Sequence, residues 1–109
     1  MTADFRVQIS RNGQRDLARI KAYLTGKASP AVADTMMNEL LDRIAALEAF
    51  PERGSVPREM EALGVRHYRH LNHGHYRIVY RVIDHMVIVT LIADGRQDMR
   101  SLLRRRLPE

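Results

Sequence analysis

The sequence predicts an α+β domain whose elements follow the order β-α-α-β-β-β-α. Apolar residues recur at helical spacing between residues 17 and 47, alternate with polar residues between residues 65 and 92, and return to helical spacing after residue 98. A period near 3.6 predicts a helix with one buried stripe, and a period of two predicts a strand with one buried face. We therefore expect a helical hairpin and a C-terminal helix packed on a small antiparallel-rich sheet.

One strand and one helix are predicted at the N-terminus. Phe5, Val7 and Ile9 alternate with polar residues, as in a short half-buried strand. A first helix of about three turns, ending near Gly26, is indicated by apolar residues on one stripe: Leu17, Ile20, Tyr23 and Leu24.

A capping signal marks the start of the second helix. Ser29 can accept hydrogen bonds from the free amides of a first turn, and Pro30 stands at the first helical position, where no N–H is needed. The apolar face that follows contains Met36, Met37, Leu40, Leu41, Ile44 and Leu47. Pro51 and Gly54 end the run, and the short link between the helices predicts an antiparallel hairpin.

A loop and three strands are predicted next. Residues 51–64 contain two prolines and two glycines, so we expect a connection with one helical turn at residues 60–63. The strands are expected at residues 65–71, 75–82 and 85–92, with hairpin turns at "NHG" and "ID". Since the last strand is almost wholly apolar, it should be covered on both faces, the second by Met99, Leu102 and Leu103.

Length and composition narrow the functional classes. The 109 residues are enough for one domain, expected to span residues 1–109. The absence of cysteine excludes a disulfide scaffold, a thiolate zinc site and a cysteine nucleophile, and it favours the cytoplasm. No signal peptide or membrane-spanning run is expected. The net charge is +5, and arginine accounts for 16 of the 18 basic residues, so the partner could be nucleic acid or an acidic protein.

Histidines and arginines gather around the first predicted strand hairpin. His67 and His70 should point to opposite faces of one strand, so we expect no shared metal ion. A centre that cleaves phosphodiesters needs a base, cations and an acid. Several residues offer such groups, although they would equally form a solvated basic face: Arg69, His70, His75, Arg77, Arg81 and Arg96.

The C-terminal stretch carries a second basic cluster. Arg96, Arg100 and Arg104 are four residues apart, which places them on one helical face, and Arg105 and Arg106 extend the charge around the last turn. Cations at the C-terminal end of a helix also complement the helix dipole, so the cluster is either a binding patch or a solvent-exposed helix face.

Several segments in order resemble the RelE/ParE superfamily of small toxins from type II toxin–antitoxin modules: "DLARIKAYL", "IAALEAFPERG", "GVRHY" and "YRIVYRVIDHMVIVTLIADGRQDMRSLL". The resemblance spans about residues 5 to 107. Its most specific parts are Tyr76, Arg77 and Tyr80, together with the strand-to-helix passage "ADGRQD". It implies the element order already deduced from the residues.

The superfamily divides by activity, and the resemblance favours its ParE branch. RelE-type toxins cut messenger RNA on the ribosome with basic residues and commonly a tyrosine or histidine in the last helix, whereas ParE-type toxins poison DNA gyrase. Arg77 matches a basic RelE position, but Gln97 stands where a second cation is usual. The last helix lacks tyrosine and histidine, since Leu102 or Leu103 occupies the matching position.

The resemblance implies two alternative activities and the residues for each. A gyrase inhibitor would need no cofactor and would contact its target through what we call the target set: Arg96, Arg100, Arg104 and Arg105. A messenger RNA endonuclease would use what we call the nuclease set: Arg69, His75, Arg77 and Arg96. A basic domain that binds nucleic acid directly is a third, weaker possibility.

The resemblance also implies a ParD-like antitoxin in a hetero-oligomer with the toxin. Its flexible C-terminal segment would fold along the toxin, and an acidic segment would suit the charge of +5. A helix of the antitoxin docking beside the helical hairpin would contact what we call the antitoxin set: Leu17, Tyr23, Met37 and Leu41. The alternative is that all four residues belong to the core.

Overall fold

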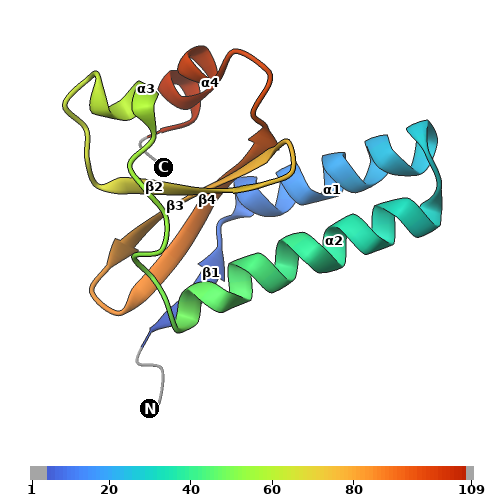
Figure 1. Cartoon of the computed structure of the whole chain (residues 1–109), viewed down its shortest axis with the longest axis horizontal. Helices are drawn as coiled ribbons and strands as arrows, with labels where there is room; N and C mark the ends of the chain where they lie inside the picture. The colour runs from blue at the N-terminus through green and yellow to red at the C-terminus, as the bar shows by residue number, and fades with distance from the viewer. Residues whose placement is uncertain (1–4, 108–109) are drawn as a thin grey trace.

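A computed structural model describes residues 5–107 as a four-stranded mixed sheet with helices on both faces (Figure 1). The strands are β1 (Arg6–Ile9), β2 (Tyr68–His73), β3 (Tyr76–Ile83) and β4 (Met86–Asp94), in the spatial order β1-β4-β3-β2. The last three strands form the predicted antiparallel meander, and β1 pairs with β4 in parallel. The predicted fold class is confirmed.

The helical hairpin consists of α1 (Arg11–Lys27) and α2 (Pro30–Ala45), which is extended by the short 3₁₀ helix η1 (Ala46–Glu48). Its two helices run side by side in opposite directions (Figure 1). The predicted cap of α2 is confirmed, because the Val32 N–H donates to Ser29 Oγ at 3.1 Å. The predicted length of α1 was too short: the helix has 17 residues and begins after Ser10, whose Oγ accepts from the Gly13 N–H at 3.0 Å. The polar first turn carried no apolar signal.

Two further helices lie on the other side of the sheet, α3 (Arg58–Glu61) and α4 (Met99–Arg106). The helical turn expected at residues 60–63 is α3, which begins two residues earlier, directly after Pro57. The strand expected at residues 65–71 is β2, which begins only at Tyr68. Within the described part of the chain, no helix is both long and apolar enough to cross a bilayer.

Both strand hairpins close through two residues and later than predicted, since the first turn was expected at residues 72–74 and the second at residues 83–84. The turns are formed by residues 74–75 and 84–85. Gly74 has a φ of +59° and Asp84 a φ of +55°. Left-handed positions of this kind select glycine or a short polar residue, and they fix the register of the strands.

Two hydrophobic cores flank the sheet. On the hairpin side, Ile78, Tyr80 and Val89 pack against α1 and α2, and on the opposite side Val79 and Leu91 pack against α3 and α4. The prediction that the C-terminal helix covers the second face of the sheet is confirmed, because Met99, Leu102 and Leu103 are buried. A bulge leaves Thr90 without a partner in β3, because Val79 pairs with Leu91 and Tyr80 pairs with Val89. The bulge allows Val89 and Ile92 to face the same core.

Candidate functional site

Arg77 of β3 is the centre of a polar cluster on the α3 side of the sheet. Its guanidinium makes two hydrogen bonds to Glu59 of α3, Nη1 to Oε2 at 2.9 Å and Nη2 to Oε1 at 3.0 Å. Its Nε donates to Nδ1 of His70 in β2 at 3.0 Å. Arg77 is only 9% exposed, so its cation is buried and already has a carboxylate partner.

The electrostatics of this cluster fix its protonation at neutral pH. The hydrogen bond from Arg77 lowers the pKa of the Glu59 carboxyl, so Glu59 is ionised. Burial, and then the neighbouring Arg77 cation, lowers the pKa of His70, so its imidazole is neutral. Because Nδ1 accepts from Arg77, the proton of His70 lies on Nε2.

A polar hollow of about 530 Å³ opens beside this cluster. We call this hollow the basic hollow. Its ionisable lining residues are Arg58, Glu59, His70, His75, Arg77 and Arg96. Gly95 forms part of its wall, where a Cβ atom would come within 2.7 Å of Arg77 Cδ. The glycine of "ADGRQD" is therefore explained by close packing against the arginine side chain.

The nuclease set is divided by the sheet. His75, Arg77 and Arg96 line the basic hollow. Arg69 lies outside it, and its Nη1 donates to the Gly54 carbonyl at 2.6 Å. The expected grouping of the four residues is therefore not observed, because Arg69 and Arg77 point to opposite faces of the sheet.

Arg96 is also paired. Its Nη2 donates to Asp94 Oδ2 at 2.7 Å and its Nε to Asp94 Oδ1 at 3.0 Å. These bonds lower the pKa of the Asp94 carboxyl to about 2. The two arginines of the basic hollow that belong to the nuclease set, Arg77 and Arg96, thus each have a carboxylate partner.

The target set divides between α4 and the loop before it. Arg100, Arg104 and Arg105 are exposed on α4, away from its buried apolar stripe. Arg96 does not share their helical face, so that prediction was wrong. The physical reason is the cap: Asp98 Oδ1 accepts from the Ser101 N–H at 3.2 Å, and the helix begins only at Met99.

Arg106 turns inward from α4 and forms a buried ion pair with Asp16 of α1. The two nitrogen–oxygen distances are 3.0 Å and 2.9 Å. Asp16 Oδ2 also accepts from the Ile92 N–H at 3.0 Å, and Arg106 donates to the Thr90 carbonyl at 3.1 Å. Asp16 was not among the residues predicted to be important, although it lies four positions before Ile20 and therefore on the buried stripe of α1.

The antitoxin set lines two separate grooves. Leu17, Met37 and Leu41 border a shallow groove of about 520 Å³ between α1 and α2. Leu17 and Met37 are half-buried against the core, whereas Leu41 is 43% exposed. Tyr23 is 62% exposed and borders a different groove, of about 410 Å³, between α1, β4 and α4.

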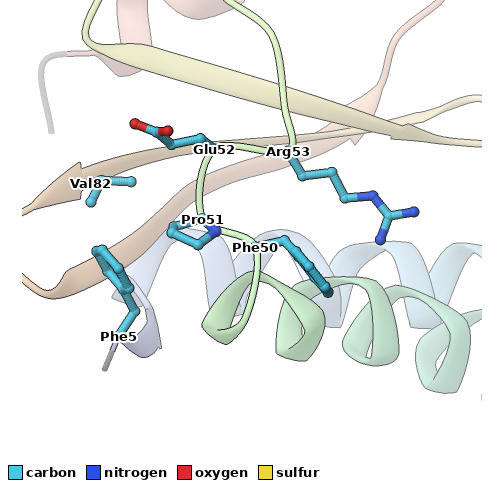
Figure 2. A pocket seen from close by; sticks show the side chains of 6 residues that line it. All are labelled: Phe5, Phe50, Pro51, Glu52, Arg53 and Val82. Atoms are coloured by element: carbon cyan, nitrogen blue, oxygen red, sulfur yellow. The ribbon is translucent and has the colours of Figure 1, made fainter. Parts of the chain in front are cut away.

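A further apolar hollow, of about 750 Å³, lies where the chain leaves η1 (Figure 2). Its apolar lining consists of Phe5, Phe50, Pro51 and Val82, with Glu52 and Arg53 at its edge. Phe50 is 62% exposed. This hollow was not among the predicted sites, although an aromatic residue before a proline at the start of a loop can indicate an exposed apolar site.

A family model for the ParE toxin of the type II toxin–antitoxin system, parDE, matches residues 7–99. The chain belongs to the ParE toxin family. The resemblance drawn from the sequence is thereby confirmed, and the RelE-type alternative is not favoured. A search of curated proteins gives no match.

This ParE-family chain also shares its fold with a solved structure, a chain of the chromosomal ParDE toxin–antitoxin system from P. aeruginosa. The TM-score is 0.72 at 14% sequence identity, and the alignment covers 85% of this chain and 98% of the other.

Across residues 5–107, no group of three or more His, Asp or Glu side chains is placed to hold a metal ion.

Proposed function

We propose that this ParE-family protein is a toxin that inhibits DNA gyrase in the cytoplasm and is neutralised by a ParD-like antitoxin. The family match over residues 7–99 carries the proposal. The surface of α4 supports it, because Arg100, Arg104 and Arg105 are exposed and make no ion pair within the described residues. Unpaired arginines are suited to an acidic protein surface or to DNA held by a protein.

The side chains of α4 favour a contact surface over a catalytic one. Its solvent-facing residues are arginines and Ser101, with no group that exchanges a proton near neutral pH. In the basic hollow, His70 Nδ1 already accepts a hydrogen bond from the Arg77 guanidinium, so this nitrogen is not available to accept a proton from a substrate. We infer that the toxin binds its target and performs no chemistry of its own.

Supercoiling and plasmid-cleavage assays with purified gyrase test the role of α4. We expect the double variant Arg100→Glu/Arg104→Glu to need at least about 10-fold more protein for the same inhibition, because charge reversal opposes an acidic target. Arg11→Glu/Arg15→Glu is the matched control, since both arginines are exposed at the start of α1. If both double variants inhibit gyrase as well as the wild type does, α4 is not the contact surface.

The antitoxin is proposed to cover the groove between α1 and α2 with apolar side chains. Leu41 is the best probe because it is exposed and lines the groove. Leu41→Asp should weaken the complex while the toxin stays folded, whereas Val32→Asp, also exposed on α2 but outside this groove, should have little effect. Equal affinity of the two variants for the antitoxin would place its helix elsewhere. The more deeply packed Met37→Asp should weaken the complex as well.

A further inference from the structure

The edge of β4 beyond the end of β1 carries backbone groups that no strand pairs. β1 ends at Ile9, opposite Val89, so residues 90–94 have no neighbouring strand on that side. The Ile92 N–H points to this side, because it donates to Asp16. The Gly95 N–H points the other way and donates to the His75 carbonyl at 2.7 Å.

Antiparallel geometry then gives the direction of the remaining groups. Alternate residues of a strand direct both their N–H and their C=O to the same neighbour. The Ile92 C=O and the Asp94 N–H therefore point to the side that β1 leaves open. In the described part of the chain, neither group has a hydrogen-bond partner. An unpaired acceptor and donor at this spacing match the backbone of an added extended strand.

A groove lies over these groups. It has a volume of about 410 Å³ and runs between α1, β4 and α4. Besides Ile92 and Asp94, its lining includes Tyr23 and Tyr76. The tyrosines supply apolar surface beside the strand edge, so the groove offers side-chain contacts as well as backbone pairing.

The charge of the groove is positive once its internal ion pairs are taken into account. Asp16 is bound to Arg106 at 2.9 Å, and Asp94 is bound to Arg96 at 2.7 Å. Arg19 and Arg105 also line the groove, and neither forms an ion pair with any described residue. These two cations favour an occupant that carries carboxylates.

We propose that an extended, acidic segment of the antitoxin binds in this groove by strand addition to β4. Its backbone would bond to the Ile92 C=O and the Asp94 N–H, and its carboxylates would pair with Arg19 and Arg105. The inference rests on the proposed toxin–antitoxin function and adds a location to it. Because Arg105 also belongs to the target set, an antitoxin bound here covers part of the surface proposed to contact gyrase.

Amide hydrogen exchange of Asp94 tests the backbone contact. The probes are the whole antitoxin encoded beside the toxin gene and overlapping synthetic peptides from its C-terminal half. In the complex we expect exchange at Asp94 to slow at least about 100-fold. The Ile92 N–H, which is already bonded to Asp16, should change little. Unchanged exchange at Asp94 in a formed complex overturns the inference.

Charge reversal tests the ion pairs. Arg19→Glu should weaken antitoxin binding at least about 10-fold. Arg15→Glu is the control, because Arg15 is exposed one helical turn earlier on α1 and does not line the groove. Equal affinity of the two variants for the antitoxin overturns the inference as well. If the wild-type toxin binds neither the whole antitoxin nor any of its peptides, the proposed antitoxin partnership itself fails.

Discussion

Asp16 and Arg106, 90 positions apart in the chain, form a buried ion pair that continues the sheet where β1 stops. The carboxylate accepts from the Ile92 N–H and the guanidinium donates to the Thr90 carbonyl, so the pair satisfies two backbone groups of β4. It also joins α1 to α4. The apolar stripe of α4 and this pair together hold the exposed arginines of the helix in place.

Removing one partner of this ion pair should strongly lower the free energy of unfolding. Asp16→Ala leaves the Arg106 cation and the Ile92 N–H without their acceptor, so we expect the free energy of unfolding to fall by about 3–5 kcal/mol. Asp34→Ala removes an exposed carboxylate 3.8 Å from Lys21, and it should cost about 0–1 kcal/mol. Urea denaturation compares the two variants. Similar losses would show that the buried pair contributes no more than a surface pair.

Replacing Gly54 by a residue with a side chain should destabilise the fold. A Cβ atom there would lie 2.6 Å from the His70 carbonyl oxygen and 2.8 Å from the Tyr80 hydroxyl. We expect Gly54→Ala to destabilise the fold by about 1–3 kcal/mol, as overpacking does. Gly26→Ala is the control, because a Cβ atom at Gly26 would meet no neighbouring atom within 4 Å, and it should stabilise α1 by about 0.5–1 kcal/mol. Thermal unfolding would reveal the opposite signs, and a neutral Gly54→Ala would contradict the packing.

The hydroxyl of Tyr80 has a separate role at the same place. It is buried and accepts from the Gly54 N–H at 2.9 Å. Tyr80→Phe would keep the ring but leave that N–H without an acceptor, at an expected cost of about 1–3 kcal/mol. Chemical denaturation measures the loss. Wild-type stability in this variant would mean that water replaces the hydroxyl.

Acid should destabilise the protein in two stages. His70 has its pKa lowered in the fold, so below its ordinary value of 6.5 the unfolded chain binds more protons and the free energy of unfolding falls. Glu59 has a pKa below its ordinary value of 4.5, so its contribution is present above that pH and is lost as the pH falls through its folded pKa. Melting curves between about pH 7.5 and about pH 3 should show both steps.

His70→Asn isolates the first stage. An asparagine oxygen can accept from Arg77 as Nδ1 does, but it does not titrate. We expect the loss of stability between about pH 7.5 and about pH 5.5 to become smaller in this variant. An unchanged slope over that interval would assign the first stage to another group.

The apolar pattern was sufficient to predict the layers of the fold. Alternation separated the two faces of β3, and the helical spacing of Met99, Leu102 and Leu103 predicted the second cover of the sheet. Burial of apolar surface is a property of each element's own sequence, so it can be deduced without knowing the neighbours. The turns were predicted too early in the chain, because the left-handed φ of Gly74 and Asp84 decides the register and the apolar pattern does not indicate it.

The ionic contacts could not be predicted in the same way. A carboxylate in the sequence does not specify its arginine, and Glu59 and Arg77 meet only because α3 folds over β3. The bulge at Thr90 and the end of β1 at Ile9 likewise depend on strand pairing between distant segments. Consequently the candidate residues were found by type, whereas their distribution over one hollow, two grooves and one helix surface came from the structure.

The most direct measurement of the central proposal compares two targets with one preparation of toxin. The toxin would be added to gyrase with supercoiled plasmid and, separately, to translating ribosomes analysed by primer extension. We expect reduced supercoiling and accumulation of cleaved plasmid, with no messenger RNA cuts in the decoding site. Unaffected gyrase together with decoding-site cuts that disappear in Arg77→Ala would contradict the account.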